Sequence, residues 1–302
     1  MRSPFVIATI ALLAAGCGQG SAQVVSSVSP GGGPVSSGPP ATQPPPDSGG
    51  GSSTPPPAPA ETTTVQTWFI RGETLWYATT RVDRQPGIGS AAVRALLAGP
   101  SAELRAAGVG SVVPAGTQLL GLDIGDGIAT VDLSSEYASG GGSLSEQMRL
   151  AQLVYTLTQF PTVKGVRLKL DGKDTTVFSG EGIVLPDPMR RSSFADLLPP
   201  ILVESPGIGE TVSGPLVVKG TANVFEANVG IEVRTESGKV LARTFTTATC
   251  GTGCRGRYQK TIDITVSRRT QVTLIVHDDD AAGTGTPPHQ VVIPLTLMPA
   301  GS

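Results

Sequence analysis

Between residues 143 and 161 the apolar positions repeat with the 3.6-residue period of an amphipathic helix. Polar side chains fall on one narrow stripe, made of Ser145, Arg149, Gln152, Thr156 and Gln159. The rest of the circumference is mostly apolar, so we expect a sheet and a second element to cover this helix. Ser143 to Glu146 has the pattern of a capping box, and Pro161 ends the helical pattern. We predict a core helix in which Leu157→Asp unfolds the domain, whereas Gln152→Ala or Thr156→Ala does not.

Shorter patterns on either side of this helix predict strands. Residues 65–70 and 74–79 are β-rich runs joined by a hairpin turn, and residues 90–98 have a short helical pattern. A two-residue turn at residues 126–127 predicts a hairpin that pairs Ile124 with Ala129, Leu122 with Val131, and Leu120 with Leu133. A second hairpin covers residues 166–178, and loops of two or four residues both leave plausible pairs. The order predicts an α+β domain at residues 65–182, with helices on one face of a mainly antiparallel sheet.

Residues 200–298 have a different pattern, without helical periodicity. Seven short β-like runs follow one another at residues 201–204, 216–220, 229–235, 240–246, 257–265, 271–277 and 291–297. About 100 residues with seven strands separated by turn signals predict an all-β immunoglobulin-like sandwich. The proline-containing residues 183–199 are assigned to a linker between the two domains.

The N-terminal pattern is that of an exported protein. Residues 5–15 form an apolar run that is too short to span a bilayer but suits the core of a signal peptide. The run ends in Leu12-Leu13-Ala14-Ala15-Gly16-Cys17, which resembles a bacterial lipobox. We therefore expect residues 1–16 to be removed and Cys17 to carry lipid, so that the protein is extracytoplasmic and anchored to the cell membrane. The alternative is ordinary secretion with cleavage that leaves a free Cys17.

Residues 17–64 are rich in proline, glycine and serine and contain almost nothing that a core could bury. We expect a disordered tether, because such a segment cannot offset the entropy cost of ordering. Its extended parts would reach on the order of 100 Å from the membrane, which places the folded domains within the cell-wall layer. A passive spacer is the preferred interpretation, and recognition of the proline-rich segment by a partner is the alternative.

The charge and the residue types of the chain exclude several classes of function. The net charge of −2 with both signs mixed gives no basic footprint for nucleic acid. The only two histidines are His277 and His289, and neither a phosphate-binding loop nor a nucleophile elbow is present. We predict no enzyme, no catalytic residue and no cofactor.

Two sequence features could still carry chemistry. His277-Asp278-Asp279-Asp280 could form a cation site, but a polar loop at a strand end explains it better, so no metal site is predicted. Cys250 and Cys254 are separated by three residues, which predicts a local disulfide in an exported protein. A redox-active pair and a metal site are the less favoured alternatives for these cysteines.

Several motifs resemble a known domain family. Those in the first domain are Leu96-Leu97-Ala98-Gly99-Pro100, Val113-Pro114-Ala115-Gly116-Thr117, Val131-Asp132-Leu133-Ser134 and residues 150–161. Together they resemble the GerMN domain of bacterial sporulation and spore-germination lipoproteins. In the second domain, residues 205–207, 212–216 and 220–227 resemble the immunoglobulin-like domain that follows GerMN in germination proteins. The resemblance implies interaction rather than catalysis.

The sequence thus predicts a lipid-anchored protein of the cell envelope that acts as a non-enzymatic binding or assembly module. Its expected partners are the membrane, through the N-terminal lipid, and an envelope protein or cell-wall component. The first alternative is an envelope substrate-binding or cell-wall-processing protein with a site between the domains. The second, a role in sporulation or germination itself, rests on the family resemblance alone.

Overall fold

The first domain is built on a long antiparallel hairpin. In the computed structural model, which describes residues 61–180, 182–278 and 289–299, β1 (Thr62–Arg71) pairs with β2 (Thr74–Asp83) along its whole length. The short strand β3 (Val109–Gly110) pairs with the other edge of β1, at Ile70 and Arg71 only. The helices α1 (Ile88–Leu97) and α2 (Ala102–Ala106) lie between β2 and β3 in the chain. Cys17, the predicted signal peptide and most of the predicted tether lie outside the described residues.

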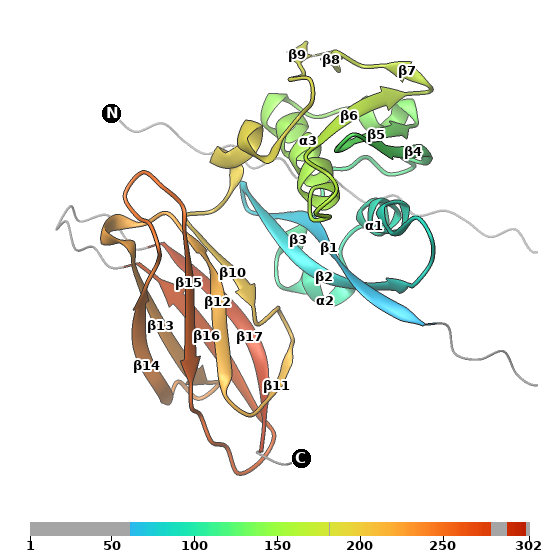
Figure 1. The fold of residues 1–302 in the computed structure, drawn as a ribbon. Coiled ribbons are helices and arrows are strands. Elements are labelled where there is room, and N and C mark those ends of the chain that lie inside the picture. The colour runs from blue at the N-terminus through green and yellow to red at the C-terminus, as the bar shows by residue number, and fades with distance from the viewer. Residues whose placement is uncertain (1–60, 181, 279–288, 300–302) are drawn as a thin grey trace, which may run out of the picture. The chain divides into compact units, whose positions relative to one another are not determined.

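A second sheet completes the first domain (Figure 1). Its order is β4 (Leu119–Gly125), β5 (Ile128–Leu133), β6 (Gly165–Leu170) and β7 (Lys173–Asp174). A 3-10 turn (Ser135–Ala138) and α3 (Ser143–Leu157) connect β5 to β6, which makes that pair parallel, while the other pairs are antiparallel. The two-stranded hairpin β8 (Val177–Phe178) and β9 (Ile183–Val184) follows. The predicted α+β class is confirmed.

The registers of the two hairpins were only partly predictable. Ile124 lies opposite Ala129 and Leu122 opposite Val131, as predicted. The pairing of Leu120 with Leu133 is wrong, because a bulge places Leu119 opposite Leu133 and leaves Leu120 51% exposed. In the second hairpin the register pairs Leu170 with Lys173, so the loop has two residues.

Helix α3 is the core element that its apolar arc predicted. Leu150, Leu153, Val154 and Leu157 are fully buried. The helix packs against β1, α1 and a 3-10 segment (Arg191–Leu197). The predicted capping box is wrong, because Gly142 is the N-cap and makes no side-chain cap, so that Ser143 is already helical. The helix ends at Leu157, four residues before Pro161.

Three residues of the polar stripe, Arg149, Gln152 and Thr156, are also buried, and side chains of the stripe bond to the edge of β1 where no strand pairs with it. The Gln159 amide accepts from the Gln66 N–H and donates to the Gln66 carbonyl, both at 2.7 Å. One turn earlier, Thr156 Oγ1 accepts from the Trp68 N–H at 3.0 Å, and Gln152 Nε2 donates to the Trp68 carbonyl at 2.9 Å. These bonds satisfy the β1 edge that β3 does not reach, so from the structure we expect Gln152 and Thr156 to contribute to folding stability, contrary to the expectation from the sequence.

Arg149 extends this stripe into the loops around the helix. Its guanidinium is buried and donates to three backbone carbonyls, those of Val112, Tyr137 and Gly140. Burial lowers the pKa of Arg149 from its usual value. The side chain therefore ties three loop segments to one helix, which is a structural role.

The second domain is a sandwich of two sheets, as predicted. One contains β10 (Ile201–Ser205), β12 (Leu216–Ala222) and β15 (Gly256–Ile262). The other has the order β11 (Thr211–Ser213), β17 (Gln290–Met298), β16 (Thr270–His277), β13 (Asn228–Thr235) and β14 (Val240–Thr247). All seven predicted runs are strands. The additional strand, β11, runs parallel to β17. It has only three residues, so it is too short to show an alternating pattern in the sequence.

Residues 183–199, assigned to a linker from sequence, are packed against the first domain. Strand β9 pairs with β8, and Leu185, Met189 and Phe194 are buried. The Arg191 guanidinium lies 4.7 Å from the Tyr155 ring centroid, and its Nη2 donates to the Tyr155 carbonyl at 3.1 Å. None of the described helices is long and apolar enough to cross a membrane.

Candidate binding site

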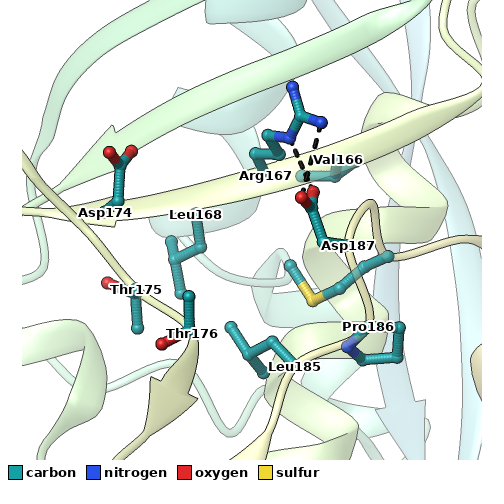
Figure 2. Close-up of a pocket in the computed structure, with 10 residues that line it drawn as sticks. Val166, Arg167, Leu168, Asp174, Thr175, Thr176, Leu185, Pro186 and Asp187 are labelled. Carbon is teal, nitrogen blue, oxygen red and sulfur yellow. Dashed lines mark hydrogen bonds and ion pairs between the residues drawn. The ribbon is translucent and has the colours of Figure 1, made fainter.

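A pocket of about 370 Å³ opens beside β6 in the first domain (Figure 2). It forms where the chain leaves the β6–β7 hairpin, makes the β8–β9 hairpin, and returns to β6 at Met189. The lining residues are Val166, Arg167, Leu168, Asp174, Thr175, Thr176, Leu185, Pro186, Asp187 and Met189. The site therefore depends on two chain segments that approach one strand from the same side.

The inner wall of the pocket is apolar and rigidly held. Val166, Leu168 and Met189 are each at most 3% exposed. Val166 and Met189 exchange two backbone hydrogen bonds of 2.9 Å, which fix the returning segment on β6. The Leu185 N–H donates to the Thr176 carbonyl at 2.9 Å and closes the base of the β8–β9 hairpin. These bonds form the pocket without a ligand.

The rim of the pocket is charged, but its charges are paired. Arg167 Nε lies 2.6 Å from Asp187 Oδ1, and Figure 2 shows this pair joining β6 to the returning segment. The hydrogen bond that Arg167 donates to Asp187 raises the pKa of Arg167. Asp174 lies 3.5 Å from Lys169 Nζ. All three charged side chains of the lining are thus in ion pairs, and the pocket presents no unpaired charge.

The lining set suits reversible binding. It has two hydroxyl groups, on Thr175 and Thr176, but no histidine or cysteine. Nucleophilic catalysis needs a base within hydrogen-bonding reach of the nucleophile, and the two lining carboxylates are engaged by Arg167 and Lys169. The pocket can hold a group of suitable shape, and we find no arrangement in it that would break a bond.

The residues singled out from sequence lie elsewhere. Cys250 and Cys254 form a disulfide with a Cα–Cα distance of 5.7 Å, in the loop between β14 and β15. His289 Nδ1 lies 2.8 Å from Asp278 Oδ2 at the ends of β16 and β17. Asp279 and Asp280 lie outside the described residues, and among the described ones no group of three or more His, Cys, Asp or Glu could hold a metal ion.

A site between the domains, the alternative from sequence, has a partial counterpart. The described residues of both domains belong to one unit, and within it the Tyr77 hydroxyl donates to the Glu204 carbonyl. Burial raises the pKa of Tyr77. Next to this bond lies a pocket of about 430 Å³, whose lining includes Trp76 and Glu103 from the first domain and Glu210 from the second.

The pocket beside β6 was not predictable from the sequence pattern. Arg167, Thr176 and Asp187 carry no motif, and their proximity follows from the return of the chain to β6. The one available signal was the second hairpin, whose two-residue register places Asp174 and Thr175 next to β6. That register was ambiguous in the sequence.

The fold defines a two-domain protein in which an immunoglobulin-like sandwich follows an α+β domain. Residues 60–176 match the family model described as sporulation and spore germination. Residues 200–284 match the model of the immunoglobulin-like domain of bacterial spore germination. The chain therefore carries a sporulation and spore-germination domain followed by a germination-type immunoglobulin-like domain, and the resemblance inferred from the motifs is confirmed.

Solved structures include three similar chains. The first GerMN domain of the sporulation protein GerM from Bacillus subtilis is 25% identical, with 43% of this chain and 98% of that chain covered and a TM-score of 0.38. The tandem GerMN domains of the same protein are 19% identical, with 67% and 62% covered and a TM-score of 0.39. A Clostridium perfringens protein described as a lipoprotein is 22% identical, with 46% and 93% covered and a TM-score of 0.33. No match to a curated protein was found.

Proposed function

We propose that this protein is a lipid-anchored component of the cell envelope that binds or assembles with a partner and catalyses no reaction. The observation that carries the proposal is the pair of domain matches, because both families are named for sporulation or germination and stand in tandem in one chain. The lipobox-like sequence ending at Cys17 and the proline-rich residues that follow support attachment through a tether.

The described chemistry of the first domain is consistent with binding. Its pocket has paired rim charges and an apolar wall. Pockets that bind neutral groups are commonly apolar, with a few polar groups that fix orientation. We propose that the partner is an envelope protein or cell-wall component that contacts the folded domains.

The anchoring part of the proposal is tested by detergent phase separation of cells that express the whole chain. We expect the wild-type protein in the detergent phase and Cys17→Ser in the aqueous phase. Equal partitioning of the two proteins into the aqueous phase would refute lipid attachment.

The binding part of the proposal is tested by crosslinking in intact envelopes, followed by capture of the protein and identification of what it carries. We expect one partner to be enriched over a control strain that expresses the same chain with Leu157→Asp, which should not fold. No enrichment over that control would refute a binding function of the folded domains.

The pocket lined by Trp76, Glu103 and Glu210 keeps a second candidate open, that of an envelope substrate-binding protein. Two carboxylates and an aromatic wall favour a cationic group on such a substrate. Binding of soluble cell-wall fragments by the purified wild-type protein, and its loss in Glu210→Gln, would support this second function.

A further inference from the structure

The ladder along β6 has a gap at Leu168. On the edge that faces β7, Leu170 pairs with Lys173, and Val166 forms an antiparallel bridge with Met189. Between these two pairs, the Leu168 carbonyl accepts from the Thr175 N–H at 3.0 Å. Among the described residues, the Leu168 N–H has no hydrogen-bond acceptor. The second bond is missing because the chain turns away after Thr175 to form the β8–β9 hairpin.

This free donor faces the pocket. In a strand, the N–H groups of residues two apart point to the same edge, so the Leu168 N–H points to the side on which Val166 bonds to Met189. Thr175 and Met189, which flank this position on that side, both line the pocket, and Thr175 is labelled in Figure 2. Leu168 is 3% exposed, and buried backbone donors in folded proteins are nearly always paired. The missing acceptor therefore has to come from a group that enters the pocket.

The side chains that line the pocket define the charge, polarity and size of the group that can enter it. The rim carboxylates and the Arg167 guanidinium are already in ion pairs, so a charged ligand would be desolvated without gaining a counter-charge. Leu168, Leu185 and Met189 offer apolar surface that a water molecule bound to the N–H would leave uncovered. A volume of about 370 Å³ is near the lower end of small-ligand pockets. The fitting group is small, neutral and aliphatic and has a carbonyl oxygen next to its apolar part.

We propose that this pocket binds one aliphatic residue of an extended segment of the partner protein, whose backbone carbonyl accepts a hydrogen bond from the Leu168 N–H. The proposal rests on the proposed binding function and specifies the chemistry of the partner. A polypeptide supplies both required parts at fixed spacing, because every aliphatic side chain in it is one bond removed from a backbone that carries a carbonyl. The hydrogen bond would complete the β6 ladder in the manner of an added strand.

The test uses the purified protein labelled with ¹⁵N and three small probes. N-acetyl-leucine N-methylamide is neutral, N-acetyl-leucine is its anionic counterpart, and N-acetyl-lysine N-methylamide is cationic. We expect the neutral probe to shift the Leu168 amide proton downfield in a saturable manner, and both charged probes to bind at least roughly tenfold more weakly. Absence of a Leu168 shift, or equal binding of the charged probes, would overturn the proposal.

A matched pair of variants separates the pocket from the fold. Thr176→Phe places a ring in the pocket, whereas Val177→Phe adds the same ring one residue later, at a side chain that is 53% exposed and does not line the pocket. We expect the first variant to abolish probe binding and the second to retain it, with native tryptophan fluorescence in both. Retained binding in a folded Thr176→Phe protein would contradict the assignment.

The same variants distinguish failure of this site from failure of the proposed function. If wild type and Thr176→Phe capture the same envelope partner equally, binding stands and the pocket assignment falls. If neither captures a partner while the neutral probe still binds at Leu168, the site stands and its role in partner binding falls. A Leu168 shift that depends on protein concentration without any probe would assign the pocket to a second copy of the chain and overturn a separate partner.

Discussion

Replacing Gln152 with alanine tests the most unexpected feature of the fold, the use of helix side chains in place of a strand. Gln152 is fully buried; its Nε2 donates to the Trp68 carbonyl at 2.9 Å and its Oε1 accepts from the Val112 N–H at 3.1 Å. Gln152→Ala leaves the buried Trp68 carbonyl and the half-buried Val112 N–H without these partners. Each such group costs about 1–3 kcal/mol, so we expect a loss of about 2–6 kcal/mol in the free energy of unfolding. Domains are stable by about 5–15 kcal/mol, which makes this loss a large fraction of the total.

Urea unfolding followed by tryptophan fluorescence measures this loss directly. The chain has two tryptophans, Trp68 in β1 and Trp76 in β2, which are 3% and 4% exposed. Their emission therefore reports on the first domain. With a urea m-value of about 2 kcal/mol/M, the middle of the usual range, the midpoint should fall by roughly 1–3 M. Gln147→Ala is the matched control, since Gln147 lies on the same helix and is exposed.

The control should change the free energy of unfolding by no more than about 0.5 kcal/mol. A second comparison isolates the hydroxyl of Thr156, which accepts from the Trp68 N–H. Thr156→Val should destabilise the domain more than Thr156→Ser, which keeps the hydroxyl. If Gln152→Ala and Gln147→Ala unfold at the same urea concentration, the helix does not substitute for a strand, and the stripe becomes available as an interface.

Three further outcomes follow from the packing and the charges. Leu157→Asp buries a carboxylate at a fully buried position and should abolish the native tryptophan emission of the first domain, unlike an exposed Gln147→Asp control. Replacing both Cys250 and Cys254 with serine opens a five-residue ring and should cost the sandwich about 2 kcal/mol, measured by calorimetry with and without reductant. A hydrogen bond from Arg234 is the main cause that lowers the pKa of Glu232. The stabilisation by Glu232 should therefore be fully present above about pH 4.3 and be lost as the pH falls through the lowered value, and Glu232→Gln should show less acid destabilisation in an unfolding titration.

Sequence patterns predicted the elements that depend on local alternation or on helical period. The seven main strands of the sandwich and α3 all have such patterns, and the turn at residues 126–127 set the register of most of the first hairpin. The bulge at Leu120 escaped prediction, because a bulge breaks the alternation on which register is judged. The capping box failed for a related reason. Ser143 had the right chemistry, but the preceding glycine took the N-cap position.

The polar stripe of α3 shows where helical periodicity stops being informative. A stripe of polar side chains is expected to face water, and the sequence of α3 alone contains nothing that contradicts this. The backbone groups that reverse this expectation lie 40 to 93 residues away in the sequence, in β1 and at Val112. Only the tertiary arrangement brings those unpaired groups to the helix, so residues such as Gln152 and Gln159 are polar because they satisfy buried backbone.

The pocket beside β6 shows the opposite situation, because no side chain that the structure describes accepts a hydrogen bond from the unpaired backbone N–H on that strand. Along β1 the exposed edge is closed by Gln159, Thr156 and Gln152, whereas along β6 the Leu168 N–H has no acceptor among the described residues. Both edges lie in one domain, in which the buried side-chain atoms Trp68 Nε1 and Glu146 Oε2 also have no hydrogen-bond partner within the described part of the chain. A buried donor without a partner is destabilising unless something else compensates. A binding site is the simplest compensation, because in the complex a carbonyl of the partner would accept the hydrogen bond that the Leu168 N–H lacks in the unbound protein. We accordingly expect the free energy of unfolding in urea to be higher in the presence of the neutral leucine probe than in its absence. In Thr176→Phe the probe should make no difference.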